Sequence, residues 1–318
     1  MEYVALPNID LLISRIGFGA EPLGGADWGD IDEQLAIEAV AKALALGVNL
    51  FDTADVYGLG RSEELLSEAL GVHRHDAVIV TKFGVNWQPV IGTQRARTFF
   101  DSSPKHVYEA VENSLRRLRI DSIPIYLIHW PDPMTPFSET LEALQHSQQA
   151  GKIRYFGVSN FSLEQLKEAC RITAISVIEL QYSLLDRAAN DGVLSFCMQQ
   201  QIGVLVYGTL GQGLLTGKFS QTTKFHENDR RSRLASFQGQ QFLKNLQCAE
   251  RVKYIAEKYA KQPAQVATRW ALEHPAVSCA IVGAKTPAQV ESNVGVSGWK
   301  LTKDDAAYLE QDKEKEAG

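Results

Sequence analysis

Short apolar runs recur along the chain at spacings that predict buried strands. Each is bounded by glycine or polar residues and is apolar at most positions. Such runs are typical of strands buried on both faces, as in a parallel sheet that is covered by helices. The predicted strands lie within residues 15–20, 47–52, 77–83, 125–130, 154–160, 176–182, 203–208 and 278–284.

The segments between these runs carry the period of amphipathic helices. In 31–47 and 104–120, apolar residues recur at i, i+3 and i+4, which gives each helix one face to bury. Capping residues stand where these helices should begin: Asp32 precedes the first, and Ser103 followed by Pro104 precedes the second. The pattern therefore predicts strands that alternate with helices.

This alternation continues without a compositional break, which predicts a single α/β domain over residues 1–318. Eight strand–helix units are the number in a (β/α)8 TIM barrel, whose active site forms at the carboxyl ends of the strands. An open, doubly wound sheet is the alternative. However, residues 17–25 read GFGAEPLGG and lack the GxGxxG fingerprint of such a nucleotide-binding sheet. We therefore predict the barrel.

A polar stretch at about 220–242 is longer than an ordinary connection between a strand and a helix. It contains Arg230, Arg231 and Arg233. On the active-site side of a barrel it would be either a lid or a mobile insertion. Because arginines bind phosphates, their presence favours a lid, which would close above a bound anion. We therefore expect this loop to cover a cofactor.

Four polar residues follow the ends of three consecutive predicted strands. Asp52 and Tyr57 follow the second, Lys82 the third and His129 the fourth. Taken singly, each also fits a structural role, as an ion pair, a loop tyrosine or a core histidine. A carboxylate, a phenol, an ammonium and an imidazole at neighbouring strand ends are difficult to explain by packing alone. They predict a site that protonates a carbonyl while a hydride is delivered.

Within this group Tyr57 is the candidate proton donor. The pKa of a free phenol is near 10, and we expect the neighbouring Lys82 ammonium to lower it. Asp52 would keep Lys82 charged and fixed. His129 would orient the carbonyl oxygen or assist proton transfer.

Composition narrows the class of protein. The chain is 45% hydrophobic and 22% charged, as in a globular enzyme, and its net charge of -6 argues against nucleic acid or an acidic membrane as the main partner. The four cysteines show no spacing of a zinc site, so we expect no metal. Neither a signal peptide nor an apolar run of roughly 20 residues is evident, so we expect a cytoplasmic protein without membrane contact.

Seven motifs occur along the chain in this order: FDTADVYGLGRSEELL, VTKFG, LIHWPDP, GVSNF, LQYSLL, GLLTGKF and GAKTPAQVESN. Together they resemble the aldo-keto reductase family, and the resemblance runs from residue 17 to residue 293. It implies a (β/α)8 barrel that binds NADPH in an extended form without a Rossmann domain. It also implies that the four strand-end residues form the family's catalytic tetrad.

The resemblance assigns the nicotinamide to the ends of the fifth and sixth predicted strands. Ser159, Asn160 and Gln181 carry a hydroxyl and two amides suited to a carboxamide, and Tyr182 matches the aromatic shelf under the ring. Without the resemblance, Ser159 and Asn160 would be equally well explained as a cap and turn before the next helix.

The rest of the cofactor is assigned to the last two strands. The glycines of YGTLGQGLLTGK allow the backbone to approach a pyrophosphate, although the string alone also fits a plain turn. Lys285 matches a family position that is often Arg and contacts the 2′-phosphate of NADP. Lysine keeps the charge, so we expect NADPH and leave NADH open as a second cofactor. The predicted contacts are Tyr207, Gly208, Thr209, Leu210, Gly211, Gln212, Lys218, Arg233, Gly283, Lys285, Gln289 and Asn293.

Candidate substrate contacts are Glu21, Trp28, Trp87 and Trp130, all in loops that follow predicted strands. Many relatives carry a Thr-Trp pair where this chain has Ala20 and Glu21. The carboxylate of Glu21 either accepts hydrogen bonds from a sugar or polyol or points into solvent.

We therefore predict an NADP(H)-dependent oxidoreductase that interconverts an aldehyde or ketone with an alcohol, aldoses and polyols included. The alternative is a cofactor-sensing regulatory or binding subunit with little turnover. An aldolase or hydrolase with a Schiff-base lysine is disfavoured, because Lys82 beside Asp52 should stay protonated. The natural substrate, the direction of the reaction and the oligomeric state stay open.

Overall fold

The computed structural model describes residues 1–25, 31–89, 96–226 and 229–311. Within them, eight parallel strands form a closed barrel in the order β10-β11-β12-β3-β4-β5-β8-β9. Each predicted run overlaps one of these strands, so the predicted barrel is confirmed. The strands are β3 (Ile16–Gly19), β4 (Leu50–Asp52), β5 (Val78–Phe83), β8 (Ile123–Ile128), β9 (Ile153–Ser159), β10 (Val177–Gln181), β11 (Gly203–Tyr207) and β12 (Val277–Gly283).

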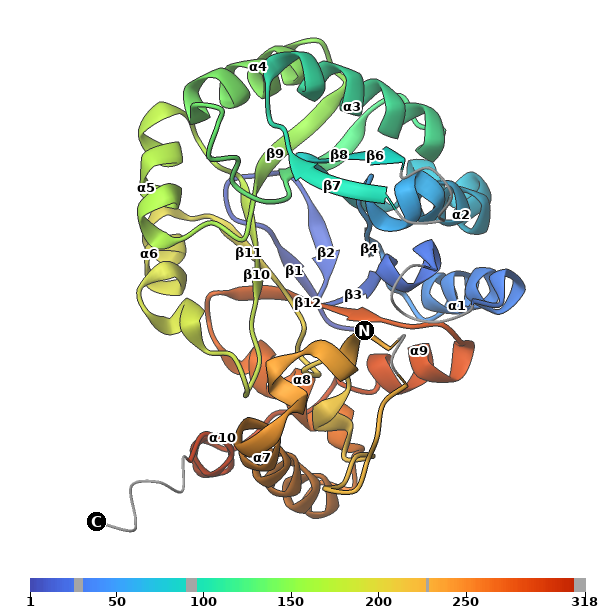
Figure 1. Ribbon diagram of the computed structural model, residues 1–318, viewed down its shortest axis with the longest axis vertical. Helices are drawn as coiled ribbons and strands as arrows, with labels where there is room; N and C mark the ends of the chain where they lie inside the picture. Colours follow the sequence, from blue (N-terminus) through green and yellow to red (C-terminus); the bar gives the residue numbers. More distant parts are fainter. Residues whose placement is uncertain (26–30, 90–95, 227–228, 312–318) are drawn as a thin grey trace.

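Helices surround the barrel, with α10 at its periphery (Figure 1). The predicted caps are present: the Asp32 side chain accepts from Leu35 N, and the Ser103 side chain accepts from His106 N. Within the described residues no helix is both long enough and apolar enough to cross a bilayer. The helices are α1 (Glu33–Ala45), α2 (Arg61–Leu70), α3 (Pro104–Leu118), α4 (Phe137–Gln149), α5 (Leu163–Ile172), α6 (Val193–Gln200), α7 (Gly239–Lys258), α8 (Pro263–Glu273), α9 (Pro287–Val294) and α10 (Lys303–Leu309).

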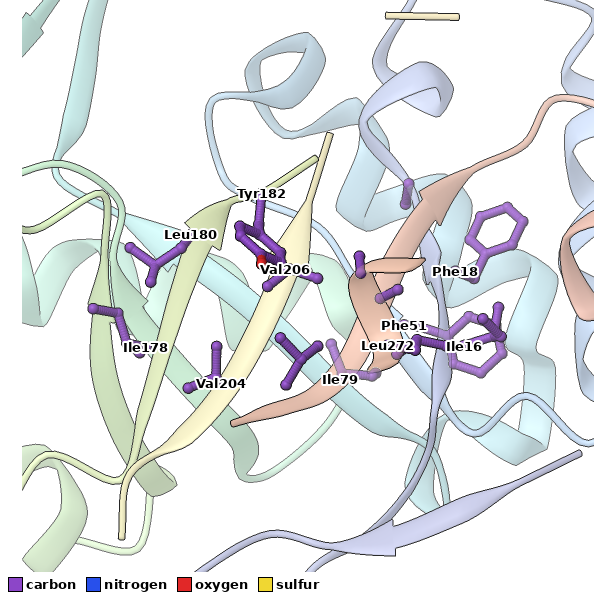
Figure 2. Packing of buried hydrophobic residues seen from close by; sticks show 14 of the residues in the cluster. Ile16, Phe18, Phe51, Ile79, Ile178, Leu180, Tyr182, Val204, Val206 and Leu272 are labelled. Carbon is purple, nitrogen blue, oxygen red and sulfur yellow. The ribbon is translucent and has the colours of Figure 1, made fainter. Parts of the chain in front are cut away.

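Alternating residues of the barrel strands belong to two separate apolar layers. Leu50 and Val80 face the barrel interior, whereas Phe51 and Ile79 belong to the layer between strands and helices. Figure 2 shows part of the outer layer, including Phe51, Ile79 and Val204. Because successive side chains of a strand point to opposite faces, this alternation decides which residues can reach a site inside the barrel.

A hairpin that the sequence pattern did not predict closes one end of the barrel. Strand β1 (Tyr3–Ala5) pairs antiparallel with β2 (Leu12–Ser14). Leu6, Leu11 and Ile13 pack with the inward-facing residues of the barrel strands. A second unpredicted hairpin, formed by β6 and β7 (residues 85–89 and 96–100), follows β5. The first hairpin fills the end near the strand starts, which leaves the carboxyl ends for a cavity.

The polar stretch predicted as a loop over 220–242 is shorter than expected. Helix α7 begins at Gly239, so the last four of these positions are helical. Two short 3-10 turns, at 230–233 and 235–237, precede it. The physical reason is aromatic packing: Phe237 and Phe242 are buried in a small cluster with Leu214, and Phe219 packs against it.

Candidate active site

A cavity of about 620 Å³ opens at the carboxyl ends of the barrel strands. Its volume lies within the range typical of sites for small molecules and cofactors. Asp52, Tyr57 and His129 line one part, and Lys285 and Gln289 line another. The cavity therefore joins the predicted proton-transfer residues to the predicted cofactor residues Lys285 and Gln289.

The structure brings the four strand-end residues together. Lys82 Nζ donates to Asp52 Oδ2 at 2.5 Å and to the Thr53 carbonyl at 3.1 Å. The same ammonium lies 5.4 Å from the centre of the Tyr57 ring, whose edge-on contact with the His129 ring has a centroid distance of 5.6 Å. Asp52 and Lys82 reach each other because both occupy inward-facing positions of adjacent strands.

Glu179 is a cavity residue that the sequence reasoning missed. It lines the cavity, is 2% exposed, and its Oε1 lies 3.3 Å from Lys82 Nζ. Its position in β10 is two residues before Gln181, and residues two apart on a strand share a face. The sequence signal for Glu179 was this two-residue spacing from Gln181, which puts both side chains on the face of β10 that points into the barrel.

Burial and charge act in opposite directions on Lys82. Burial alone would lower the pKa of this fully buried ammonium, but the carboxyl groups of Asp52 and Glu179 reverse the effect and raise it. Lys82 is therefore held in its charged form, as expected from the sequence.

The expected lowering of the Tyr57 pKa is wrong in direction. Burial raises the pKa of the Tyr57 phenol well above its usual value, and the charges of Asp52, Glu21 and Glu179 raise it further. The main reason is burial, which disfavours the charged phenolate form of Tyr57. Tyr57 is consequently a phenol that keeps its proton, which suits a donor but not a base.

His129 is held neutral. Burial lowers the pKa of its imidazole well below the usual value, and the Lys82 charge lowers it further. A neutral imidazole has one donor and one acceptor nitrogen, which allows it to orient an oxygen without carrying charge.

The predicted nicotinamide residues form one hydrogen-bonded group beside the tetrad. Asn160 Nδ2 donates to the His129 carbonyl and to Ser159 Oγ, both at 3.0 Å, and Tyr207 Oη donates to Asn160 Oδ1 at 2.7 Å. Asn160 has a positive φ of 61°, a conformation that asparagine tolerates better than most residues. Asn160, Gln181 and Tyr207 line the cavity, whereas Ser159 lies fully buried behind Asn160.

The structure does not bring Tyr182 into the cavity. Its ring stacks on Trp270 at 5.0 Å and its hydroxyl donates to Asn190 Oδ1 at 3.0 Å, within the outer apolar layer (Figure 2). Strand alternation explains this: Tyr182 follows the inward-facing Gln181 and points outward. The predicted shelf role of Tyr182 is therefore wrong, and Tyr207 is the tyrosine that faces the cavity.

The glycine-rich segment after β11 is placed as predicted for most of its residues. Gly208, Thr209, Leu210 and Gln212 line the cavity, whereas Gly211 lies in the same turn without lining it. After β12, Gly283, Lys285 and Gln289 also line the cavity. Asn293 lies behind them and donates to the Gly283 carbonyl at 3.4 Å.

Three cations gather near this part of the site. Burial lowers the pKa values of Lys218 and Lys285, and the charge of Arg231 lowers both further, while Asp229 opposes this effect. Arg233, the predicted contact, is exposed and does not line the cavity. Arg230 lines it instead, because the short turn at 230–233 points this earlier residue inward.

The structure places only some of the predicted substrate residues at the cavity. Glu21 and Trp130 line the cavity, and Glu21 Oε1 lies 3.4 Å from Arg230 Nη1. Trp87 lies half-buried in β6 and is absent from the described lining of the cavity. Trp28 lies outside the described residues.

Known proteins resemble this chain over nearly all of its length. A model of the Aldo/keto reductase family matches residues 15–314. The chain belongs to the aldo/keto reductase family. It is 36% identical over 308 residues to the aldo-keto reductase YhdN of Bacillus subtilis, covering 96% of this chain and 91% of that protein. It is 32% identical over 321 residues to the NADH-specific methylglyoxal reductase of Escherichia coli, covering 98% of each.

Among solved structures, the glycerol dehydrogenase of Gluconobacter oxydans matches with a TM-score of 0.90 and 37% identity, covering 96% of this chain and 93% of that one. The family, the barrel and the oxidoreductase class predicted from the sequence are thus confirmed. Reduction of a carbonyl group is consistent with membership of this family, and aldo/keto reductases use nicotinamide cofactors.

The residues of this chain fit such a cofactor. Amide and hydroxyl groups of Asn160, Gln181 and Tyr207 converge near the tetrad, where a carboxamide requires donors and acceptors. At Gly208, whose φ is 71°, an added Cβ would lie 3.3 Å from Gln181 Cγ, so the backbone approaches this site closely. The cations near Lys285 provide the charge that phosphates require.

We predict that Lys82→Met destabilises the protein by about 3 kcal/mol or more near neutral pH, because it leaves Asp52 and Glu179 buried without a cation. Loss of the ammonium raises the pKa values of both carboxyl groups in the folded state. The folded protein then holds protons that the unfolded chain releases, so the loss of stability grows as pH rises. Urea unfolding at about pH 5 and about pH 8 measures it.

Lys105→Met is the matched control. Its side chain is 85% exposed and lies 3.9 Å from Glu109, so the expected change is within about 0.5 kcal/mol at both pH values. A Lys82→Met variant that is as stable as the control would contradict the assigned charge cluster.

Proposed function

We propose that this aldo/keto reductase reduces an aldehyde or ketone with NADPH and that Tyr57 supplies the proton. The observation that carries the proposal is the convergence of Tyr57, Lys82, Asp52 and His129 at one cavity. The reverse reaction, oxidation of an alcohol, uses the same groups in the opposite protonation states.

When bound, the reduced nicotinamide supplies a hydride to the carbonyl carbon. Tyr57 then gives its phenolic proton to the carbonyl oxygen, on which negative charge develops. Lys82 stabilises this charge through space, and neutral His129 orients the oxygen by a hydrogen bond. Asp52 keeps Lys82 in place. Asn160, Gln181 and Tyr207 bind the carboxamide and so orient the ring.

The preference for NADPH over NADH is supported by the cations near the far part of the cavity. Lys218, Lys285 and Arg231 interact electrostatically, and Asp229 offsets only part of their charge. A 2′-phosphate would satisfy this excess of positive charge, whereas the 2′-hydroxyl of NADH would not. The E. coli relative is NADH-specific by name, so cofactor preference differs within the family.

A small, polar substrate is supported by the residues at the cavity mouth. Glu21 supplies hydrogen-bond acceptors, Arg230 supplies donors, and Trp130 adds an apolar wall with 41% of its surface exposed. Relatives named for methylglyoxal and glycerol act on compounds of this kind. We therefore propose small oxo or polyhydroxy compounds as substrates.

The segment that precedes α7 is proposed to cover the cofactor. Its residue Arg230 lies 3.4 Å from Glu21, which also lines the cavity. Its aromatic residues Phe219, Phe225 and Phe237 pack edge to face and hold the segment against the barrel. Arg230 then takes the role predicted for Arg233.

We predict that Tyr57→Phe lowers kcat for reduction by about 100-fold or more, because the proton donor is lost while the ring is kept. Affinity for NADPH, measured by quenching of protein fluorescence, should stay unchanged. The assay follows NADPH consumption with 4-nitrobenzaldehyde, methylglyoxal and glyceraldehyde.

Tyr254→Phe is the matched control, since this tyrosine is 59% exposed on α7 and should keep full activity. A Tyr57→Phe variant with the wild-type rate would rule out Tyr57 as the donor. Wild-type protein that binds NADPH but reduces no member of the panel would favour the cofactor-sensing role instead.

We predict that Lys285→Met weakens NADPH binding about tenfold, equal to a loss of about 1.4 kcal/mol, and leaves NADH binding within about twofold. The physical reason is that only NADPH carries the 2′-phosphate. Fluorescence titration with each cofactor measures both constants. Lys303→Met, an exposed position at the start of α10, serves as control. Equal weakening of both cofactors would contradict the assigned phosphate site.

A further inference from the structure

Glu179 is buried in the barrel interior, where the mechanism above gives it no role. It is 2% exposed and borders the cavity beside Gln181. Its Oε1 lies 3.3 Å from Lys82 Nζ. Strands β8 and β9 separate β10 from β5 in the barrel, so this contact crosses the interior and does not follow from strand pairing.

The charges of this cluster do not balance if every group is ionised. Asp52 and Glu179 would carry two negative charges around the single ammonium of Lys82, and all three side chains are buried. An uncompensated charge in the interior is strongly unfavourable, so one of the carboxyl groups is expected to hold a proton.

Geometry indicates which carboxyl group holds the proton. Asp52 has the closer contact with Lys82, 2.5 Å against 3.3 Å for Glu179. The two carboxyl groups also lie within hydrogen-bond reach of each other, and two carboxylates cannot form that bond without a proton. Glu179 Oε2 is buried, and no described residue donates a hydrogen bond to it.

We propose that Glu179 is an uncharged carboxylic acid at neutral pH, which donates a hydrogen bond to Asp52 and helps to position Lys82 beneath Tyr57. Glu179 is thus a positioning residue, and this role rests on the proposed reductase function. With Glu179 neutral, Asp52 alone balances Lys82, and the cluster carries no net charge next to the proton donor.

The groups that face Glu179 favour its neutral form. Burial raises the pKa of Glu179 well above its usual value, the charge of Asp52 raises it further, and Lys82 opposes them. Three other groups interact with its charge: Tyr57, Tyr207 on β11 and Cys279 on β12. Each of these would become negative on ionisation, so none of them stabilises a Glu179 carboxylate.

A pH dependence of the reaction follows. When pH rises through the pKa of Glu179, the cluster gains one negative charge, and Tyr57 becomes a weaker proton donor. Reduction should therefore slow on the alkaline side. Glu179→Gln keeps the size and hydrogen-bonding capacity of the side chain but has no proton to lose.

The first test needs no catalytic activity and so separates this proposal from the proposed function. A group whose pKa is raised in the folded state contributes stability at low pH that is lost as pH rises from the unfolded value, roughly 4.3, through the folded value. The thermal midpoint of Glu179→Gln minus that of wild type should therefore increase with pH, by about 3 °C or more between about pH 5 and pH 8.

Glu68→Gln, an exposed position on α2, is the control and should show a constant difference. A difference for Glu179→Gln that stays constant or decreases with pH would overturn the proposal, since Glu179 would then be ionised in the folded protein. If Glu179→Gln does not fold, infrared spectra of wild type with ¹³C-carboxyl glutamate decide at pH 7. A protonated glutamate band is expected, and its absence overturns the proposal.

The second test is the pH profile of reduction with NADPH. Relative to its own rate near neutral pH, Glu179→Gln should lose the alkaline decline that wild type shows. A purely structural role would lower the rate equally at every pH. Identical profiles for wild type and variant would overturn the positioning role.

Discussion

The buried ammonium of Lys82 is the constraint on which the site depends. A cation that is fully enclosed requires nearby carboxyl groups, and these come from β4 beside it and from β10 across the barrel interior. Only a closed barrel brings these two strands to the same side chain. The β1–β2 hairpin fills the opposite end with apolar residues, so polar groups are concentrated where the cavity opens.

The same cluster determines the state of the two groups that face the substrate. Burial and nearby carboxyl groups keep Tyr57 protonated, and burial together with Lys82 keeps His129 neutral. A protonated phenol next to a neutral imidazole is arranged for donation to a carbonyl oxygen. Oxidation of an alcohol by the same groups would require Tyr57 to lose its proton first.

Much of this site could be predicted from the sequence because strand ends in a parallel barrel meet at one edge. That rule located Asp52, Lys82 and His129, and the family motifs added Asn160 and Gln181. The failures have physical causes. Tyr182 was misassigned because strand alternation turns it outward, and Glu179 was overlooked although the same alternation turns it inward. Arg230 lines the cavity in place of the predicted Arg233. A short 3-10 turn sets the direction of these side chains, and such a turn leaves no periodic pattern in the sequence.

The protonation state of Tyr57 can be measured directly by ¹³C NMR of protein labelled at the tyrosine Cζ atom, with Tyr57→Phe to assign the signal. Burial and the surrounding carboxyl groups predict that Tyr57 stays protonated up to about pH 10, the value at which a free phenol is half ionised. A Tyr57 signal that titrates clearly below that pH would contradict the role assigned to the buried cluster. The positive charge of Lys82 would then outweigh burial and the carboxyl groups at the phenol.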